Sequence, residues 1–149
     1  IARNVGVSAT AVYRHFPDKG ALLGALAHEA GVMLARAQRA AQAKVTDPKA
    51  GFEATGAAYV RFALAHPALF RLMMARMHFG GSQGRAGEDD GLKLLFDNVA
   101  ALSPPDATDR EIQAKAIQSW AVVHGLAMLM LDGQVPVDDQ LIEQVTRWN

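Results

Sequence analysis

Signals that start and stop helices recur along the whole chain, whereas no stretch alternates apolar and polar residues long enough to indicate a strand. Serine, threonine and aspartate side chains accept hydrogen bonds from the free N–H groups of a first helical turn. Such residues precede apolar runs with helical spacing at Ser8, Asp18, Asp47, Thr108 and Asp138. The sequence therefore predicts an all-α fold.

The helices expected from these signals differ in length. A short one ends at Gly6, and the others are expected at 9–15, 18–44, 48–66, 68–77, 92–102, 109–131 and from 138 onward. Glycines and an acidic triplet between Gly80 and Gly91 indicate a loop. The last helix is expected to carry one apolar stripe, formed by Val137, Leu141, Val145 and Trp148 with Ile142 beside it.

Length and composition exclude several classes of protein. A chain of 149 residues can bury a core large enough to be stable without disulfide bonds or bound metal ions. The absence of cysteine rules out disulfide scaffolds, zinc fingers and thiol nucleophiles. The longest nearly apolar run, Trp120 to Leu131, is too short to cross a bilayer, and the first residues do not resemble a signal peptide. We therefore expect a soluble, cytoplasmic protein.

The formal net charge is zero, but the charges are unevenly distributed. Residues 1–76 carry ten basic and four acidic side chains, whereas residues 77–149 carry five basic and eleven acidic ones. A positive first half favours a polyanionic partner. The alternative is a protein that is merely dipolar.

The first fifteen residues have the pattern of a helix-turn-helix, whose second short helix enters the major groove of DNA. Gly6 can take a positive φ in the turn, and Ser8 can cap a helix whose first residues are small enough to approach the bases closely. The expected DNA contacts are Ser8, Thr10, Tyr13, Arg14, His15 and Lys19, with Tyr13 and Lys19 suited to phosphates. The alternative is a pair of ordinary helices at the edge of a bundle.

Residues 6–23, Gly-Val-Ser-Ala-Thr-Ala-Val-Tyr-Arg-His-Phe-Pro-Asp-Lys-Gly-Ala-Leu-Leu, closely resemble the end of the DNA-binding domain in TetR-type transcriptional regulators. The helix junction at His66-Pro67 is similar to one in the ligand domains of this family. Trp120, His124 and Gly125 resemble the tryptophan–histidine–glycine signature of one C-terminal subclass. From the family pattern we expect that a basic arm and a first helix are missing before Ile1.

The resemblance implies two functional parts. Residues 1–45 would be the remainder of a helix-turn-helix DNA-binding domain with its connecting helix, and residues 46–149 a helical ligand-binding and dimerisation domain. It also implies a repressor that binds double-stranded operator DNA, responds to a small-molecule effector and forms a homodimer through its last two helices.

The composition of the long apolar helix agrees with a dimer. Ile117 to Leu131 is apolar on nearly every side, so such a helix must be buried on two sides. One side can face the core of its own chain and the other a second copy. A fully internal helix in a monomer is the alternative.

Soft, bulky side chains suggest an apolar ligand pocket in the second part. Methionine and aromatic residues tolerate ligands of varied shape, and two histidines could act as polar anchors. The expected ligand-binding residues are Phe70, Met73, Met74, Met77, His78, Phe96, Trp120, His124 and Met128. The alternative is that most of them fill the core and that the histidines are satisfied core residues.

No catalytic constellation is recognisable in the sequence. It contains no glycine-rich phosphate loop, no His-Glu-x-x-His motif and no serine in a nucleophile elbow, and the histidine spacing fits no metal site. We therefore expect a protein without catalytic residues, cofactor or metal. The alternatives to a DNA-binding regulator are a helical ligand-binding or protein-interaction bundle that does not bind DNA, and a small α-helical enzyme.

Overall fold

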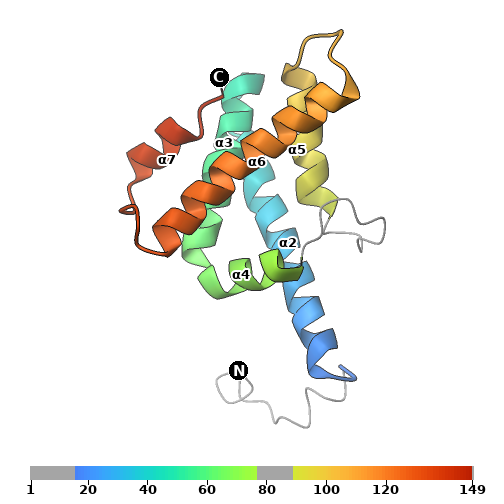
Figure 1. Cartoon of the computed structure of the whole chain (residues 1–149), viewed down its shortest axis with the longest axis vertical. Helices are drawn as coiled ribbons and strands as arrows, with labels where there is room; N and C mark the ends of the chain where they lie inside the picture. Colours follow the sequence, from blue (N-terminus) through green and yellow to red (C-terminus); the bar gives the residue numbers. More distant parts are fainter. Residues whose placement is uncertain (1–15, 77–88, 149) are drawn as a thin grey trace.

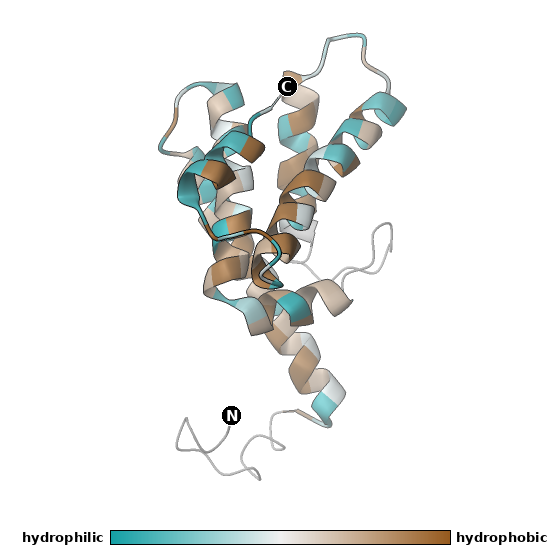
Figure 2. Ribbon diagram, turned by 60° about the vertical axis from the view of Figure 1, so that its left-hand side comes forward, coloured by the Kyte–Doolittle hydropathy of each residue, from teal (hydrophilic) through white to brown (hydrophobic). Residues whose placement is uncertain are grey.

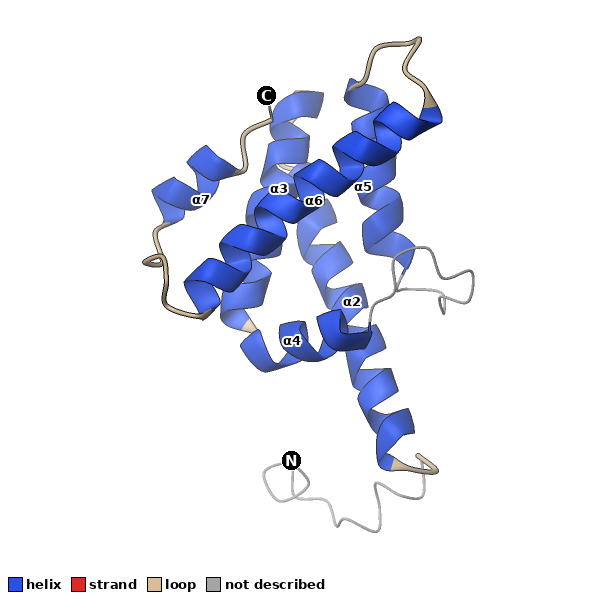
Figure 3. Cartoon of the chain, viewed as in Figure 1, coloured by secondary structure: helices blue, strands red, loops and turns tan. Residues whose placement is uncertain are grey.

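The structure, a computed structural model, describes residues 16–76 and 89–148, and the regular elements within these residues are all α-helices (Figure 3). They are α2 (Lys19–Gln42), α3 (Pro48–Ala65), α4 (Pro67–Arg76), α5 (Asp89–Leu102), α6 (Asp109–Leu131) and α7 (Asp139–Val145). The predicted all-α fold is confirmed. The predicted helix-turn-helix at residues 1–15 and most of the loop between Gly80 and Gly91 lie outside the described residues.

The predicted N-caps within the described residues are confirmed by their contacts, whereas α5 begins at Asp89, three residues before the predicted start at residue 92 and inside the predicted loop. Asp18 and Asp47 each accept a hydrogen bond of 2.7 Å from the backbone N–H three residues later. Thr108 and Glu111 form a reciprocal capping box at the start of α6. Asp138 accepts two backbone hydrogen bonds at the start of α7. These contacts are local in sequence, which explains why the sequence predicts them well.

The last helix is shorter than the predicted apolar stripe requires. α7 ends at Val145, so Val137 lies before the helix and Trp148 lies beyond it. Trp148 packs instead against Phe52 of α3, with ring centroids 5.1 Å apart and an edge-to-face geometry. Ile142, expected beside the stripe, is the buried residue of α7 at 1% exposure. The expectation of one helical stripe from Val137 to Trp148 is therefore wrong.

α2 is a long helix that runs through the bundle and projects beyond it. Its 24 residues correspond to about 36 Å. Its second half packs among the other helices, whereas its first turns extend away from them (Figure 1). α3 and α4 both pack against α2, and α6 crosses in front of α2 and α3 (Figure 1). The N-terminal end of α2 is therefore held well away from the domain that follows it.

Two apolar clusters make up the core. The larger one joins α2, α3, α4, α6 and α7, and its most buried large side chains are Val60, Phe70 and Ile142. The smaller one joins α3, α5 and α6 through Phe52, Val99 and Ala116. α6 therefore contributes to both clusters along its length.

One side of α6 stays uncovered in the single chain. Ile117, Val122 and Leu129 are each exposed to about two fifths, at 42%, 42% and 41%. By length and composition α6 could cross a membrane, yet its opposite side carries the buried residues of a core helix. The hydropathy colouring changes from hydrophilic at the start of α6 to hydrophobic along its second half (Figure 2). The two-sided character predicted from the sequence thus appears as one buried side and one exposed apolar side.

Candidate functional site

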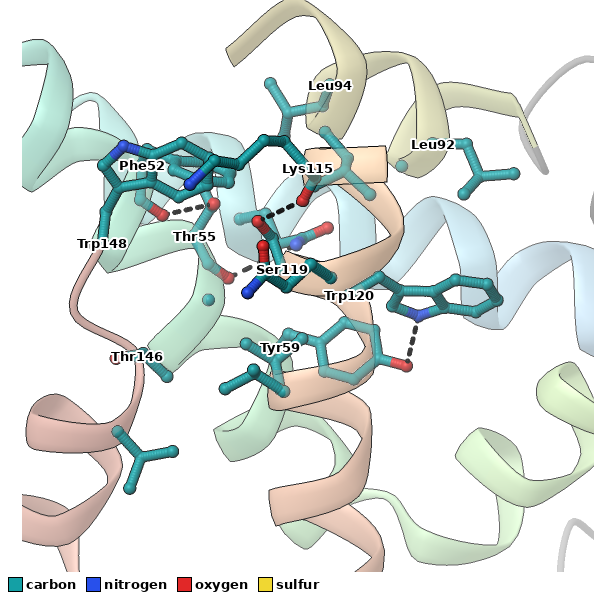
Figure 4. Close-up of a pocket in the computed structure, with 18 of the residues that line it drawn as sticks. Phe52, Thr55, Tyr59, Leu92, Leu94, Lys115, Ser119, Trp120, Thr146 and Trp148 are labelled. Carbon is teal, nitrogen blue, oxygen red and sulfur yellow. Dashed lines mark hydrogen bonds between the residues drawn. The ribbon is translucent and has the colours of Figure 1, made fainter. Parts of the chain in front are cut away.

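A cavity of about 230 Å³ lies between α2, α3, α5, α6 and the residues that follow α7. An engineered cavity of about 150 Å³ is large enough to hold benzene, so this one can accept a somewhat larger apolar group. Its apolar wall is formed mainly by Leu34, Phe52, Leu92, Leu95, Trp120, Val123 and Trp148. Figure 4 shows side chains from several helices converging on this space.

Polar side chains from three helices also reach the cavity. The amide nitrogen of Gln38, on α2, donates to the carbonyl oxygen of Thr55 on α3 at 3.3 Å. The Thr55 hydroxyl donates to the carbonyl oxygen of Phe52 at 2.7 Å. The Ser119 hydroxyl donates to the carbonyl oxygen of Lys115, also at 2.7 Å. The hydroxyl protons are thus used within their own helices, while the hydroxyl oxygens can still accept.

Tyr59 connects the cavity to the main core. The indole N–H of Trp120 donates to the Tyr59 hydroxyl oxygen at 3.2 Å (Figure 4). The Tyr59 hydroxyl lies 3.0 Å from Nδ1 of His124 and 3.6 Å from the sulfur of Met74. Because an indole can only donate, the Tyr59 proton is free for His124 or for Met74. The Tyr59 ring also packs edge to face against Phe70, at 5.4 Å between centroids.

Burial shifts the pKa of both partners in this contact. It raises the pKa of Tyr59 to about 12, because the apolar surroundings disfavour the phenolate, and the hydrogen bond from Trp120 opposes this shift. Burial lowers the pKa of His124, because it disfavours the imidazolium. Near neutral pH both groups are therefore uncharged, which suits a hydrogen bond between a hydroxyl and an imidazole nitrogen.

This arrangement predicts a pH dependence of stability. The unfolded chain takes up the His124 proton near the ordinary pKa of about 6.5, whereas the folded chain takes it up at a lower pH. The contribution of His124 to stability is therefore present above about pH 6.5 and is lost as the pH falls through the lowered pKa. Urea unfolding between about pH 7.5 and pH 5 should show a smaller fall in stability for His124→Gln than for the parent chain.

His66→Gln is the matched control for this measurement. His66 is the C-cap of α3, and its ring contacts Phe62 in a tilted geometry, with centroids 5.0 Å apart. We expect this variant to keep the pH dependence of the parent chain. An equal pH dependence in His124→Gln and the parent would contradict the role given to His124.

The structure places the predicted ligand residues in several environments. Trp120 lines the cavity, whereas Phe70 and Met73 are buried in the main core at 0% and 3% exposure. Met74 and His124 lie on the core side of Tyr59, where both contact its hydroxyl. Of the other predicted ligand residues, Met128 packs on the main core and Phe96 packs on the smaller cluster. Met77 and His78 lie outside the described residues.

Sequence reasoning missed Gln38, Tyr59, Ser119 and Trp148 as residues of this site. Tyr59 follows the apolar spacing of its helix, so it reads as a core residue. Trp148 reads as part of an apolar stripe for the same reason. Gln38 offered a weak signal, because it is an uncharged polar residue within a long helix, as Gln42 also is.

Of the predicted DNA contacts, Lys19 alone lies within the described residues. Lys19 is exposed and begins α2, at the end that projects from the bundle (Figure 1). Ser8, Thr10, Tyr13, Arg14 and His15 lie outside the described residues. The cavity and the predicted DNA-binding end are therefore connected by α2, which contributes Leu34 and Gln38 to the cavity wall.

The predicted order, a DNA-binding region followed by a long helix and a helical domain, can be compared with known families. Residues 52–148 match the tetracyclin repressor-like C-terminal domain, and residues 1–26 match the tetR family of bacterial regulatory proteins. The chain therefore belongs to the TetR family. None of the curated proteins matches the chain.

A solved structure shows the same fold. The chain is similar to a protein of unknown function from Rhodococcus sp. RHA1, with 30% sequence identity and a TM-score of 0.74. The match covers 97% of this chain and 76% of that chain. The family resemblance of the sequence and the predicted order, a helix-turn-helix domain followed by a helical domain, are thus confirmed. Family membership makes the protein a DNA-binding transcriptional regulator, while the tryptophan–histidine–glycine subclass stays a prediction.

Proposed function

We propose that this regulator is a cytoplasmic, homodimeric repressor that leaves its operator when a small, largely apolar effector enters the cavity. The observation that carries the proposal is the position of α2. This helix begins at Lys19 beside the DNA-binding region and supplies Leu34 and Gln38 to the cavity wall. In this proposal residues 1–45 form the DNA-binding part with its connecting helix, and residues 46–149 form the ligand-binding and dimerisation part.

Polar contacts give the effector two routes to α2. Gln38 and Gln42 lie one turn apart on this helix; Gln38 bonds to the backbone of α3, and Gln42 donates to Asn98 of α5 at 2.6 Å. An effector that moves α5 or takes up the Gln38 amide therefore acts directly on α2. The second route runs from Trp120 through Tyr59 to Met74 on α4. α4 packs against α2, so a shift of α4 also reaches α2.

The movement required at the DNA is small. Two recognition helices must lie about 34–36 Å apart to enter successive major grooves, so a change in the angle of α2 disturbs the fit in both subunits. The effector must bind the DNA-incompetent shape more tightly than the DNA-bound shape. A coupling free energy of about 1–3 kcal/mol would weaken operator binding about 5–150-fold, and operator DNA would weaken effector binding by the same factor.

The uncovered side of α6 supports the homodimer. Ile117, Val122 and Leu129 lie on this side together with the small residues Ala121 and Gly125. A side chain added at Gly125 would meet nothing within 4 Å in the single chain. A second α6 can therefore approach closely here, and its apolar side chains would cover those of the first.

DNA binding is tested through Lys19. We expect Lys19→Ala to weaken binding to all DNA sequences alike and to lower the salt dependence of binding by about 1 in slope for each subunit, because a phosphate contact is removed. The matched control is Lys44→Ala, another exposed lysine just beyond the other end of α2. Fluorescence anisotropy with operator and unrelated DNA at several salt concentrations makes the comparison. An unchanged salt slope in Lys19→Ala would show that the phosphate contacts lie elsewhere.

A further inference from the structure

We propose that the effector is a small organic acid, whose apolar body fills the cavity and whose carboxylate lies at a cationic rim formed by Lys115 and Arg147. This inference rests on the proposed function, which makes the cavity the effector site, and it adds the chemical class of the ligand. The observations that carry it are the charge of the lining, the placement of Lys115 and the size of the cavity.

The lining has a charge bias that the surrounding sequence does not share. Among the described residues that line the cavity, Lys115 and Arg147 carry positive charge and none carries a carboxylate. Residues 77–149 as a whole contain five basic and eleven acidic side chains. Two of these five basic residues are thus at the cavity, in the acidic half of the chain. A lining of this kind attracts an anion and disfavours a cation.

Carboxylates one turn before the two rim residues are bonded to other groups, Glu111 to Thr108 and Glu143 to Arg61. Glu53 of α3 lies close to the rim, where its carboxylate accepts a hydrogen bond of 2.9 Å from the backbone N–H of Trp148. That contact holds the segment that carries Arg147.

Lys115 is placed where an apolar wall meets solvent. Its ammonium nitrogen lies 4.9 Å from the centroid of the Trp148 ring, which packs in turn on Phe52. In Figure 4, Lys115 and Trp148 lie together on one side of Ser119, whereas Trp120 and Tyr59 lie on the other side. A ligand with an acid group at one end and an apolar body at the other matches this separation. Its body would lie toward Trp120 and its carboxylate toward Lys115.

The size of the cavity limits the body of the ligand. At about 230 Å³ it exceeds the cavity of about 150 Å³ that accepts benzene, so a phenyl ring with a short chain is a suitable probe. 3-Phenylpropionate has this shape and carries a carboxylate. 3-Phenylpropionamide has nearly the same shape without the charge. The pair therefore separates the contribution of charge from that of shape.

The chain reports its own ligand binding in this experiment. It contains two tryptophans, Trp120 and Trp148, and both line the cavity. Titration of the full chain with each probe can therefore be followed by intrinsic tryptophan fluorescence near neutral pH. We expect the acid to bind about 10-fold more tightly than the amide, because a charge-assisted contact is stronger than a neutral one. The preference should decrease as salt is added, because the rim is exposed to solvent.

Variants test which residues provide the preference. In the double variant Lys115→Met, Arg147→Met, binding of the acid should weaken about 10-fold, whereas binding of the amide should stay unchanged. Methionine keeps most of the apolar part of the lysine and arginine side chains. The matched control is Arg110→Met, which removes an exposed positive charge from the same helix outside the cavity lining. This control should keep the preference for the acid.

The outcomes separate this inference from the proposed function. Equal binding of acid and amide, equal loss in Arg110→Met, or no fluorescence response to either probe would overturn the organic-acid inference. If the acid binds as expected but with the same affinity in the presence and absence of operator DNA, the inference on ligand class stands. In that case the proposed function, release of the operator by the effector, is wrong.

Discussion

Ser119→Phe is expected to abolish the response to effector while leaving operator binding nearly unchanged. Ser119 lies in the middle of the cavity lining, and its hydroxyl bonds within α6, to the carbonyl of Lys115 (Figure 4). A phenyl group at this position would occupy the space that the effector needs. Release of the operator should therefore fall from the expected 5–150-fold to about 1-fold. The effect on DNA binding alone should be small, because Ser119 is on α6, whereas the proposed DNA contact Lys19 lies at the N-terminal end of α2.

Ser119→Ala is the matched control for this prediction. It removes the hydroxyl but leaves the cavity open, so release of the operator by 3-phenylpropionate should be retained. Operator binding would be measured by fluorescence anisotropy with and without the probe, and probe binding by tryptophan fluorescence. If Ser119→Phe still released the operator on addition of the probe, the effector would bind somewhere other than this cavity.

Ala121→Glu is expected to convert the protein to a monomer and to remove most of its operator affinity. Ala121 is exposed on the uncovered side of α6, so the substitution should leave the fold of the single chain intact. In a dimer the added carboxylate would be buried without a partner, at a cost of about 3–5 kcal/mol. Dimerisation should then weaken at least ~100-fold. A monomer holds one half-site, so operator affinity should fall steeply as well.

Sedimentation velocity at micromolar concentration measures the change in assembly, and circular dichroism shows whether the helices are kept. The matched control is Gln113→Glu, which adds the same charge two turns earlier at an exposed position of α6. Substitutions in α7 are less suitable for this test of the dimer, because Leu141 packs on the main core and Val145 lines the cavity. A parent chain that sediments as a monomer would refute the dimer proposal.

The sequence predicts the helices of the described residues well, because their starts depend on local contacts. Asp18, Asp47, Thr108 and Asp138 each bond to backbone groups within their own first turn. The helix that begins after Asp18 was predicted to reach Lys44 and ends at Gln42, a small difference of the kind expected at a fraying end.

The candidate site was harder to predict, because it depends on how distant segments pack. Tyr59 and His124 are 65 positions apart and meet through their side chains, so no spacing within one helix reveals the contact. Trp148 follows the helical spacing of Leu141 and Val145, but α7 ends before it, and its ring turns to Phe52. The methionines and aromatic residues were correctly recognised as bulky and apolar. Which of them face a cavity and which fill the core is decided by packing between helices.

The short α7 has a consequence for how a molecule reaches the cavity. A helix of 7 residues is too short to be stable on its own, so it depends on contacts with the rest of the chain. Buried Ile142 and the exposed ion pairs of Arg61 with Asp139 and Glu143, both 2.9 Å, hold it against α3. Its end and the residues after it, Val145 to Trp148, close one wall of the cavity. Because a short helix and a few side-chain contacts hold this wall, it can open locally at a free energy below that of global unfolding, which provides an entrance to the cavity.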